Sequence, residues 1–258
     1  MSLLLLFLFG LAIGSFINCV VYRLNHHLSF VKGRSFCPRC KHQLSWKDNI
    51  PLFSFFWLRR RCRYCRSPIS WQYPSVELGT AVFTVITFVI TINQITNSQF
   101  LIYNLIFNLL ITYSLIVIFV SDLLYEIIPD EVVVWGTFLA VVYLFLSKPQ
   151  SLVLNLSSGL VAAAFFLLLH LVTKGKGMGF GDVKLVFLIG LVLGWPNTAT
   201  ALFMAFLTGA TLGVILILTG KKRFKEHVPF GPFLVASAWI TLFWGQQVIA
   251  LYHYWLIR

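Results

Sequence analysis

Runs of about 20 apolar residues recur along the whole chain, and this pattern limits its fold more than any other feature. Of the 258 residues, 59% are hydrophobic and only 11% are charged. Each run is long enough to cross a bilayer as a helix. The runs lie at about 1–22, 75–93, 100–121, 131–147, 152–173, 182–197, 199–219 and 231–256. The predicted fold class is therefore all-α, a polytopic helical membrane protein with about eight transmembrane helices.

The sixth of these predicted helices is the weakest. Its apolar stretch, Leu185–Trp195, is short for a crossing and is followed by Pro196 and Asn197. Joining it to the next run would move the basic cluster 221–225 to the opposite side of the membrane, against the bias of the other cations. We therefore expect a tight hairpin at Pro196-Asn197. We also expect 179–184 to enter the membrane interface, which would leave Asp182 partly buried.

The positions of the cations predict the orientation of the chain. When alternate loops are assigned to opposite sides, all 20 Lys and Arg residues fall on one side except Lys148 and Arg258. The positive-inside rule places the cationic side in the cytoplasm and both termini outside. Membrane topology thus explains the net charge of +12, and no nucleic-acid partner is expected. The first run has no basic segment before it, so we expect a retained helix there rather than a cleaved signal.

Between the first two predicted helices lies a polar insert, residues 23–74, that contains four of the five cysteines. They form the pairs Cys37-Pro-Arg-Cys40 and Cys62-Arg-Tyr-Cys65. Two such pairs are typical of a zinc site, in which four thiolates surround one tetrahedral ion. Two disulfides are the alternative, but a cytoplasmic insert is kept reduced. Because so small a segment cannot build a sufficient core alone, we expect a structural zinc. Cys19, within the first helix, is expected to be a buried small residue.

Two aspartates stand at the edges of apolar runs. Asp122 ends the run LIVIFVSD, and Asp182 lies in GMGFGDVK. A carboxylate at the edge of a membrane helix is costly and marks a candidate functional site, although a helix-end cap is the simpler alternative. By the alternation of loops, both aspartates face the cytoplasm. Two neighbouring carboxylates share a proton, so one can activate a water molecule while the other polarises a carbonyl, as in aspartic proteases. Gly179 and Gly181 would let an extended substrate backbone approach.

Other polar residues near the predicted helix ends have simpler interpretations. Asp130 and Glu131 follow Pro129 directly, and we expect them to cap the start of a helix. His170 lies in an apolar run, where a packed or hydrogen-bonded histidine is more common than a ligand.

Taken in order, the motifs of this chain resemble those of the bacterial type IV prepilin peptidases over nearly its whole length. The motifs are Gly14–Arg23, the two cysteine pairs with Asn49-Ile-Pro-Leu between them, Pro68–Glu77, Asp122 eight residues before Asp130, Gly179-Phe-Gly-Asp182-Val-Lys184, and Pro229-Phe-Gly-Pro232. One position departs from the pattern: many relatives carry an acidic residue where this chain has Leu124.

The resemblance implies an aspartic endopeptidase of the bacterial inner membrane, with Asp122 and Asp182 as its catalytic residues. Such enzymes remove the leader of type IV prepilins or pseudopilins at the cytoplasmic face. Relatives with the four-cysteine insert also methylate the new N-terminus with S-adenosylmethionine. The sequence has no glycine-rich nucleotide-binding fingerprint of the soluble type, so it assigns no residue to the methyl donor. The substrate can belong to a pilus, a secretion system or a DNA-uptake apparatus.

This interpretation divides the chain into a first helix (1–22), a cytoplasmic insert associated with zinc and methylation (23–74), and a seven-helix peptidase core (75–258). Two other classes of function remain open at this point. A proton-coupled transporter would use Asp122 and Asp182 as a relay, although the chain has no internal repeat of the kind that transporters show. A non-catalytic zinc scaffold would explain the cysteines but would leave both aspartates without a role.

Overall fold

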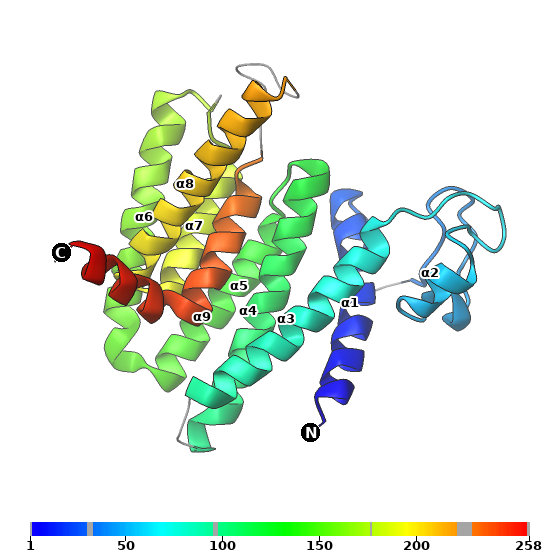
Figure 1. Cartoon of the computed structure of the whole chain (residues 1–258), viewed down its shortest axis with the longest axis horizontal. Coiled ribbons are helices and arrows are strands. Elements are labelled where there is room, and N and C mark those ends of the chain that lie inside the picture. The colour runs from blue at the N-terminus through cyan, green and yellow to red at the C-terminus, as the bar shows by residue number, and fades with distance from the viewer. Residues whose placement is uncertain (1, 30–32, 95–97, 176, 221–228, 257–258) are drawn as a thin grey trace. The chain divides into compact units, whose positions relative to one another are not determined.

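The computed structural model describes residues 2–29, 33–94, 98–175, 177–220 and 229–256, and its regular elements there are helices (Figure 1). They are α1 (Leu3–Asn25), η1 (Trp46–Asn49), α2 (Phe53–Trp57), α3 (Gln72–Gln94), α4 (Ser98–Tyr125), α5 (Asp130–Ser147), η2 (Pro149–Ser151), α6 (Leu152–Val172), α7 (Phe180–Leu193), α8 (Asn197–Leu218) and α9 (Gly231–Leu256). The chain forms two compact units, residues 1–120 and residues 121–258.

Each of the eight predicted apolar runs is a helix in the structure. Among the described residues, seven helices are long and apolar enough to cross a membrane. The eighth, α7, has 14 residues, which gives it a length of about 21 Å. The all-α fold is thus confirmed, while the sixth predicted span is shorter than the others. The basic cluster 221–225 lies outside the described residues.

In the first unit, α1 and α3 pack closely because α1 presents glycine where the two backbones meet. A Cβ atom on Gly10 would lie 2.6 Å from Ala81 Cα, and one on Gly14 would lie 2.6 Å from Glu77 Cα. Gly10 and Gly14 are four residues apart and share one face of α1. Small residues at this spacing let membrane helices approach to backbone contact.

A row of threonines on α3 makes polar contacts with α4. Thr80, Thr84, Thr87 and Thr91 are all buried. Three of them reach side chains of α4: Thr84 Oγ1 lies 3.1 Å from Tyr113 Oη, Thr87 Oγ1 lies 3.3 Å from Thr112 Oγ1, and Asn108 Nδ2 donates to Thr91 Oγ1 over 3.1 Å. Such hydrogen bonds hold helices together where lipid offers no polar partner.

In the second unit, α7 is the buried central helix. It contacts α5, α6, α8 and α9, and its residues Leu185, Val186, Leu188, Ile189 and Leu191 are almost fully buried. A helix that is apolar on all sides belongs in an interior position. This position explains why the sixth run is apolar throughout although it is short.

α7 and the two residues before it nevertheless extend beside most of α6. At one end His170 Nδ1 donates to Met178 O over 2.8 Å, and at the other Asn155 Nδ2 donates to Leu191 O over 2.8 Å. These contacts run antiparallel and span about 22 Å of α6. Together with the segment that precedes it, α7 therefore returns the chain to the opposite end of α6.

The predicted hairpin after α7 is confirmed. α7 ends at Leu193, and α8 begins at Asn197. The reversal uses Gly194 at a φ of 66°, a left-handed conformation that glycine adopts without steric cost. The N–H of Thr198 then donates to Gly194 O over 2.9 Å, which starts the next helix.

The contact of α1 with α3 provides a test of this packing. We expect Gly10→Ala to lower the thermal stability of the protein, because its methyl group meets the α3 backbone, and overpacking of this kind costs about 1–3 kcal/mol. Gly79→Ala is the matched control, since a Cβ there would have no neighbour within 4 Å. Thermal unfolding in detergent measures both variants. Equal unfolding temperatures for the two would contradict the packing described here.

Candidate functional site

The four cysteines of the insert form one cluster. Their sulfur atoms all lie within 4.8 Å of one another, and Cys37 Sγ is 3.9 Å from Cys65 Sγ. A tetrahedral zinc with bonds of about 2.3 Å needs sulfur atoms roughly 3.8 Å apart. The arrangement therefore fits a four-thiolate zinc site, in which Cys37 and Cys62 are buried and Cys40 and Cys65 lie at the surface.

The cluster is built from a repeated segment that the sequence analysis did not identify. Residues 36–46 (FCPRCKHQLSW) and 61–71 (RCRYCRSPISW) align at an offset of 25 residues. Their hydrogen bonds repeat as well: Cys37 N donates to His42 O over 2.9 Å, and Cys62 N donates to Ser67 O over 2.8 Å. Each copy supplies two thiolates, so the metal site lies between two similar turns.

The surroundings of the cluster favour thiolate at one position in particular. Hydrogen bonds from the side chain and backbone of Ser67 lower the pKa of Cys65 to about 6, whereas burial raises the pKa of the Cys62 thiol. Thiolate is the form that binds zinc. The surroundings of Cys65 therefore favour the form that binds zinc, and burial of Cys62 opposes it.

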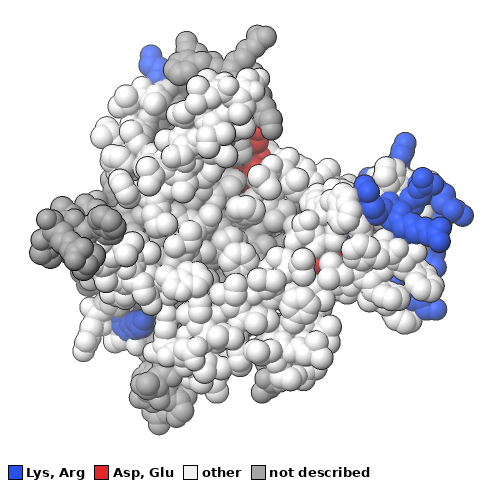
Figure 2. All heavy atoms as spheres, in the orientation of Figure 1, with Lys and Arg blue, Asp and Glu red and all other residues white. Residues whose placement is uncertain are grey.

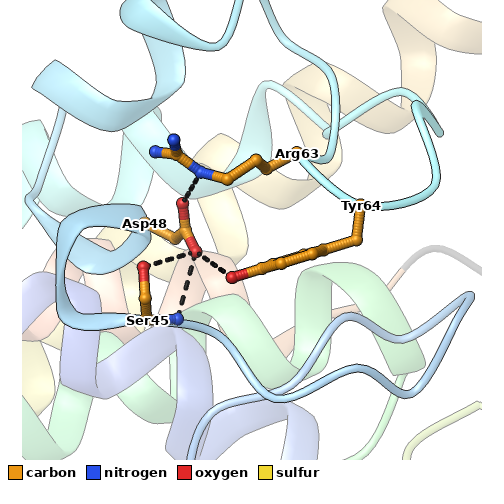
Figure 3. A network of polar contacts seen from close by, with 4 residues as sticks. All are labelled: Ser45, Asp48, Arg63 and Tyr64. Atoms are coloured by element: carbon orange, nitrogen blue, oxygen red, sulfur yellow. Dashed lines mark hydrogen bonds and ion pairs between the residues drawn. The ribbon is translucent and has the colours of Figure 1, made fainter.

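Asp48 links the two turns from outside the cluster (Figure 3). Its carboxylate accepts hydrogen bonds from Ser45 N (3.0 Å), Ser45 Oγ (2.8 Å), Arg63 Nε (2.7 Å) and Tyr64 Oη (3.2 Å). Burial of the carboxylate opposes ionisation, but the bonds from Arg63 and Ser45 hold the pKa of Asp48 below its ordinary value. This carboxylate ties the end of the first repeat to the middle of the second.

Asp182 lies in the first turn of α7 and is 8% exposed. Its Oδ2 accepts a hydrogen bond from the N–H of Gly179, the residue before the helix, over 3.1 Å. This is the reciprocal bond of a helix cap, and it satisfies an amide that the helix leaves unpaired. The predicted simple role, a helix-end cap, is therefore present, and it fixes the carboxylate at the start of α7.

Asp122 lies three residues before the end of α4 and is 5% exposed. The start of α9 is next to it: a Cβ on Gly231 would be 2.5 Å from Asp122 Oδ2. No other residue type fits at position 231 without displacing the carboxylate. In the sequence this glycine is part of the motif Pro229–Pro232, where no local pattern indicates its contact with Asp122.

Two contacts bring the segment after Asp122 to the start of α7, where Asp182 lies. Lys184 Nζ binds both carboxylate oxygens of Asp130, over 2.8 and 2.7 Å. A Cβ on Gly181 would lie 3.1 Å from Ile128 Cβ. Both aspartates therefore belong to one end of the second unit, where α4 ends and where α5, α7 and α9 begin. Asp130 and Glu131 were expected to cap α5, but the residue at the N-cap is Pro129 and no side chain makes a capping hydrogen bond there. Asp130 is instead the first residue of the helix, and its carboxylate pairs with Lys184.

His170 supports the glycine-rich segment before Asp182. Besides its bond to Met178 O, its ring lies 5.9 Å from the ring of Phe180, centroid to centroid. A Cβ on Gly175 would be 3.3 Å from His170 Cε1. The expectation of a packed or hydrogen-bonded histidine is confirmed, and His170 holds the segment that enters α7.

With this geometry established, the fold defines a multi-pass helical membrane protein, and comparison with known proteins identifies its family. The model of the Bacterial Peptidase A24 N-terminal domain matches residues 8–91, and that of the Type IV leader peptidase family matches residues 109–214. The chain belongs to the type IV leader peptidase family. No solved structure matches it.

Three relatives are named prepilin leader peptidase/N-methyltransferase. That of Aeromonas hydrophila is 33% identical, with 96% of this chain and 92% of the relative covered. That of Bacillus subtilis (strain 168) is 32% identical, with 96% of each covered. That of Legionella pneumophila is 32% identical, with 96% and 94% covered. The transporter and scaffold interpretations are not favoured by this kinship.

The cysteine cluster predicts one bound zinc per chain. We expect Cys37→Ser to lose the zinc, because only three thiolates remain around the ion and two of them, Cys40 and Cys65, are at the surface. Cys19→Ser is the matched control, since Cys19 lies in α1 outside the cluster. Elemental analysis of the purified protein measures the metal. Equal zinc content in both variants, or none in the unaltered protein, would count against the site.

Proposed function

We propose that this chain is a prepilin leader peptidase that works as an aspartic endopeptidase, with Asp122 and Asp182 as its catalytic pair. One observation carries the proposal: the segments that contain the two buried aspartates come together at one end of the second unit. The Lys184–Asp130 ion pair and the contact of Gly181 with Ile128 hold them there. Membership of the leader peptidase family supports the same assignment.

In the proposed reaction the two carboxylates share one proton. The ionised carboxylate takes a proton from a water molecule as its oxygen attacks the scissile carbonyl carbon, while the protonated carboxyl donates a hydrogen bond to the carbonyl oxygen. The C–N bond then breaks as the amide nitrogen takes up a proton. No covalent intermediate forms with the protein. Burial of both groups excludes competing water and strengthens their interactions with the reacting atoms.

Glycines would leave room for the substrate at this place. Gly179 and Gly181 lie at the entry to α7. An extended peptide backbone can approach such positions because no Cβ blocks it. The proposed substrates are type IV prepilins and pseudopilins. Their hydrophobic segment would lie in the bilayer beside the enzyme, with the bond to be cut at the membrane edge.

We further propose that the chain methylates the new N-terminus with S-adenosylmethionine. The relatives carry N-methyltransferase in their names, and this chain has the complete four-cysteine cluster. Cys37, Cys40, Cys62 and Cys65 would hold a structural zinc, since all four positions of a tetrahedral ion would be taken by protein. The insert would then be a folded platform for methylation rather than part of the protease.

The cationic residues support a cytoplasmic position for both sites. Eleven cations lie in 23–66, and Lys184 is next to the second aspartate. The positive-inside rule would place these residues, Asp122 and Asp182 at the cytoplasmic face of the bacterial inner membrane, with the termini outside. The division into a first helix, an insert and a seven-helix peptidase core describes function under this proposal, whereas the compact units divide after Val120.

The peptidase assignment is tested by cleavage of a model prepilin in liposomes. We expect Asp122→Asn and Asp182→Asn each to lower the rate by about 10³-fold or more, because neither amide can exchange the shared proton. Glu131→Gln is the control, since Glu131 is an exposed carboxylate in the first turn of the neighbouring α5. Full cleavage by a well-folded aspartate variant would refute the assignment.

The methylation assignment is tested on the mass of the cleaved product. We expect a gain of about 14 Da, one CH2, only when S-adenosylmethionine is present, as methyl transfer to an amine requires. The variant Cys37→Ser/Cys40→Ser should cleave the leader and lose this gain, because the two cysteine repeats lose their fixed arrangement without the metal. Loss of cleavage in that variant, with the helices still folded, would instead make the insert part of the protease.

A further inference from the structure

The insert carries an exposed aromatic surface that neither proposed activity uses. Phe53, Phe56 and Trp57 of α2 are 58%, 62% and 70% exposed, and Trp71 is 52% exposed. We call these four residues the aromatic patch. Phe53 stacks on Trp57 with ring centroids 5.6 Å apart, and Phe56 meets Trp71 edge-on at 6.5 Å. Contiguous exposed apolar surface of this kind marks an interaction site.

The patch is a built surface with its own support. Phe55 lies beneath it, 4% exposed, with its ring 5.5 Å from that of Phe56 and 5.0 Å from that of Trp71. Trp71 ends the second repeat of the zinc cluster, only six residues after Cys65. The metal site and α2 therefore hold the exposed rings in place.

The position of α2 along a membrane helix is fixed by one hydrogen bond. The N–H of Leu52, the residue before α2, donates to Glu77 Oε2 over 2.8 Å. Glu77 is the sixth residue of α3, which is long and apolar enough to cross the membrane. The bond therefore lies about 8 Å from the start of that helix. Each headgroup layer is roughly 5–8 Å thick. If α3 enters this layer at its first residue, α2 begins at the boundary between the headgroups and the hydrocarbon.

The backbone at Leu52 is adapted to this attachment. Its φ and ψ are 58° and −51°, and Phe53 N donates to Pro51 O over 2.6 Å. This is a γ-turn of the rare, strained form. Strained backbone persists only where its surroundings hold it, and here a buried carboxylate of α3 binds the amide of the strained residue. The attachment of α2 to α3 is thus a specific feature of the fold.

The charge next to the patch indicates what it contacts. Arg59, Arg60 and Arg61 follow α2 directly and are exposed, and the Arg60 guanidinium lies 5.0 Å from the centre of the Trp71 ring. Asp48 is the one acidic residue in 23–74. Figure 2 shows Lys and Arg gathered over the insert. Tryptophan beside arginine at headgroup depth is the composition of a surface that binds anionic lipid.

We propose that the aromatic patch and Arg59–Arg61 dock the insert on the anionic headgroups of the bilayer. The rings enter the interface, and the guanidinium groups bind lipid phosphates. This docking would hold the zinc cluster close to the membrane surface, where a substrate with a transmembrane segment presents its cut end. It is independent of the peptidase assignment, because it concerns the first unit and needs no substrate.

The test uses the full chain labelled with 5-fluorotryptophan, in nanodiscs of either phosphatidylethanolamine with phosphatidylglycerol or phosphatidylcholine alone. Trp57→Phe, Trp71→Phe and Trp135→Phe assign the fluorine signals and keep an aromatic ring at each position. Line broadening is measured with a nitroxide on the lipid acyl chain and, separately, with a water-soluble gadolinium chelate. Trp135 is the matched reference, because it is 59% exposed and is also the sixth residue of a membrane helix, α5.

We expect the lipid nitroxide to broaden Trp57 and Trp71 about as strongly as Trp135, and more in the anionic nanodiscs than in phosphatidylcholine. The triple variant Arg59→Gln/Arg60→Gln/Arg61→Gln should remove the difference between the two lipids, and its zinc content shows that the insert is folded. Trp57 and Trp71 signals broadened only by the aqueous chelate, in both lipids, would overturn the proposal and leave the patch for a protein partner.

Discussion

A bilayer offers its proteins neither hydrogen-bond partners nor a hydrophobic force between helices. This structure therefore depends on other interactions that bring its helices together. Helices satisfy their own backbone groups, but they associate only through close contact and polar bonds. Glycine supplies the contact at Gly10 and Gly14 in the first unit, and Gly159 touches Gly190 between α6 and α7 in the second. The threonine row of α3 supplies the polar bonds.

The same constraint shapes the site with the two aspartates. A carboxylate can be buried at a membrane edge only if nearby groups bind it. The carboxylate of Asp182 is stabilised because it accepts a hydrogen bond from the N–H of Gly179, the residue before α7. It also lies at the positive end of the helix dipole. A helix that starts within the protein thus lets a carboxylate be buried where lipid alone would not. α7 is short and Asp182 is buried for the same reason, because the helix begins inside the protein.

Much of this fold could be predicted from the sequence because apolar runs of membrane length have few alternatives. All eight helices were expected, as was the hairpin at Pro196-Asn197. The interior position of α7 could not be predicted, since a short apolar run has the same pattern whether protein or lipid surrounds it. The packing of α1 on α3 was also missed, although Gly10 and Gly14 show the required spacing.

The candidate sites could also be predicted only in part. The spacing of the cysteines predicted their cluster, because two CxxC turns have one common use in a reduced insert. The role of Asp48 was not predicted, since a carboxylate gains its partners from chain folded around it, here from a turn 15 residues later. Gly231 was present in a known motif, but only three-dimensional structure shows that it lies against Asp122. Long-range neighbours of this kind leave no local pattern in the sequence.

The insert shows how a small segment can remain ordered beside a membrane. Its regular elements in the described residues are one turn of 3₁₀ helix and the five-residue α2, too little to bury a core that offsets the entropy of folding. Three different constraints replace the core: the cysteine cluster, with the zinc proposed for it, joins the two repeats, Asp48 ties them from outside, and Glu77 fastens α2 to α3. Each constraint limits the motion of a different part of the insert. Loss of the metal should therefore loosen the repeats while α2 stays attached to its membrane helix, and the insert would unfold in parts rather than as one unit.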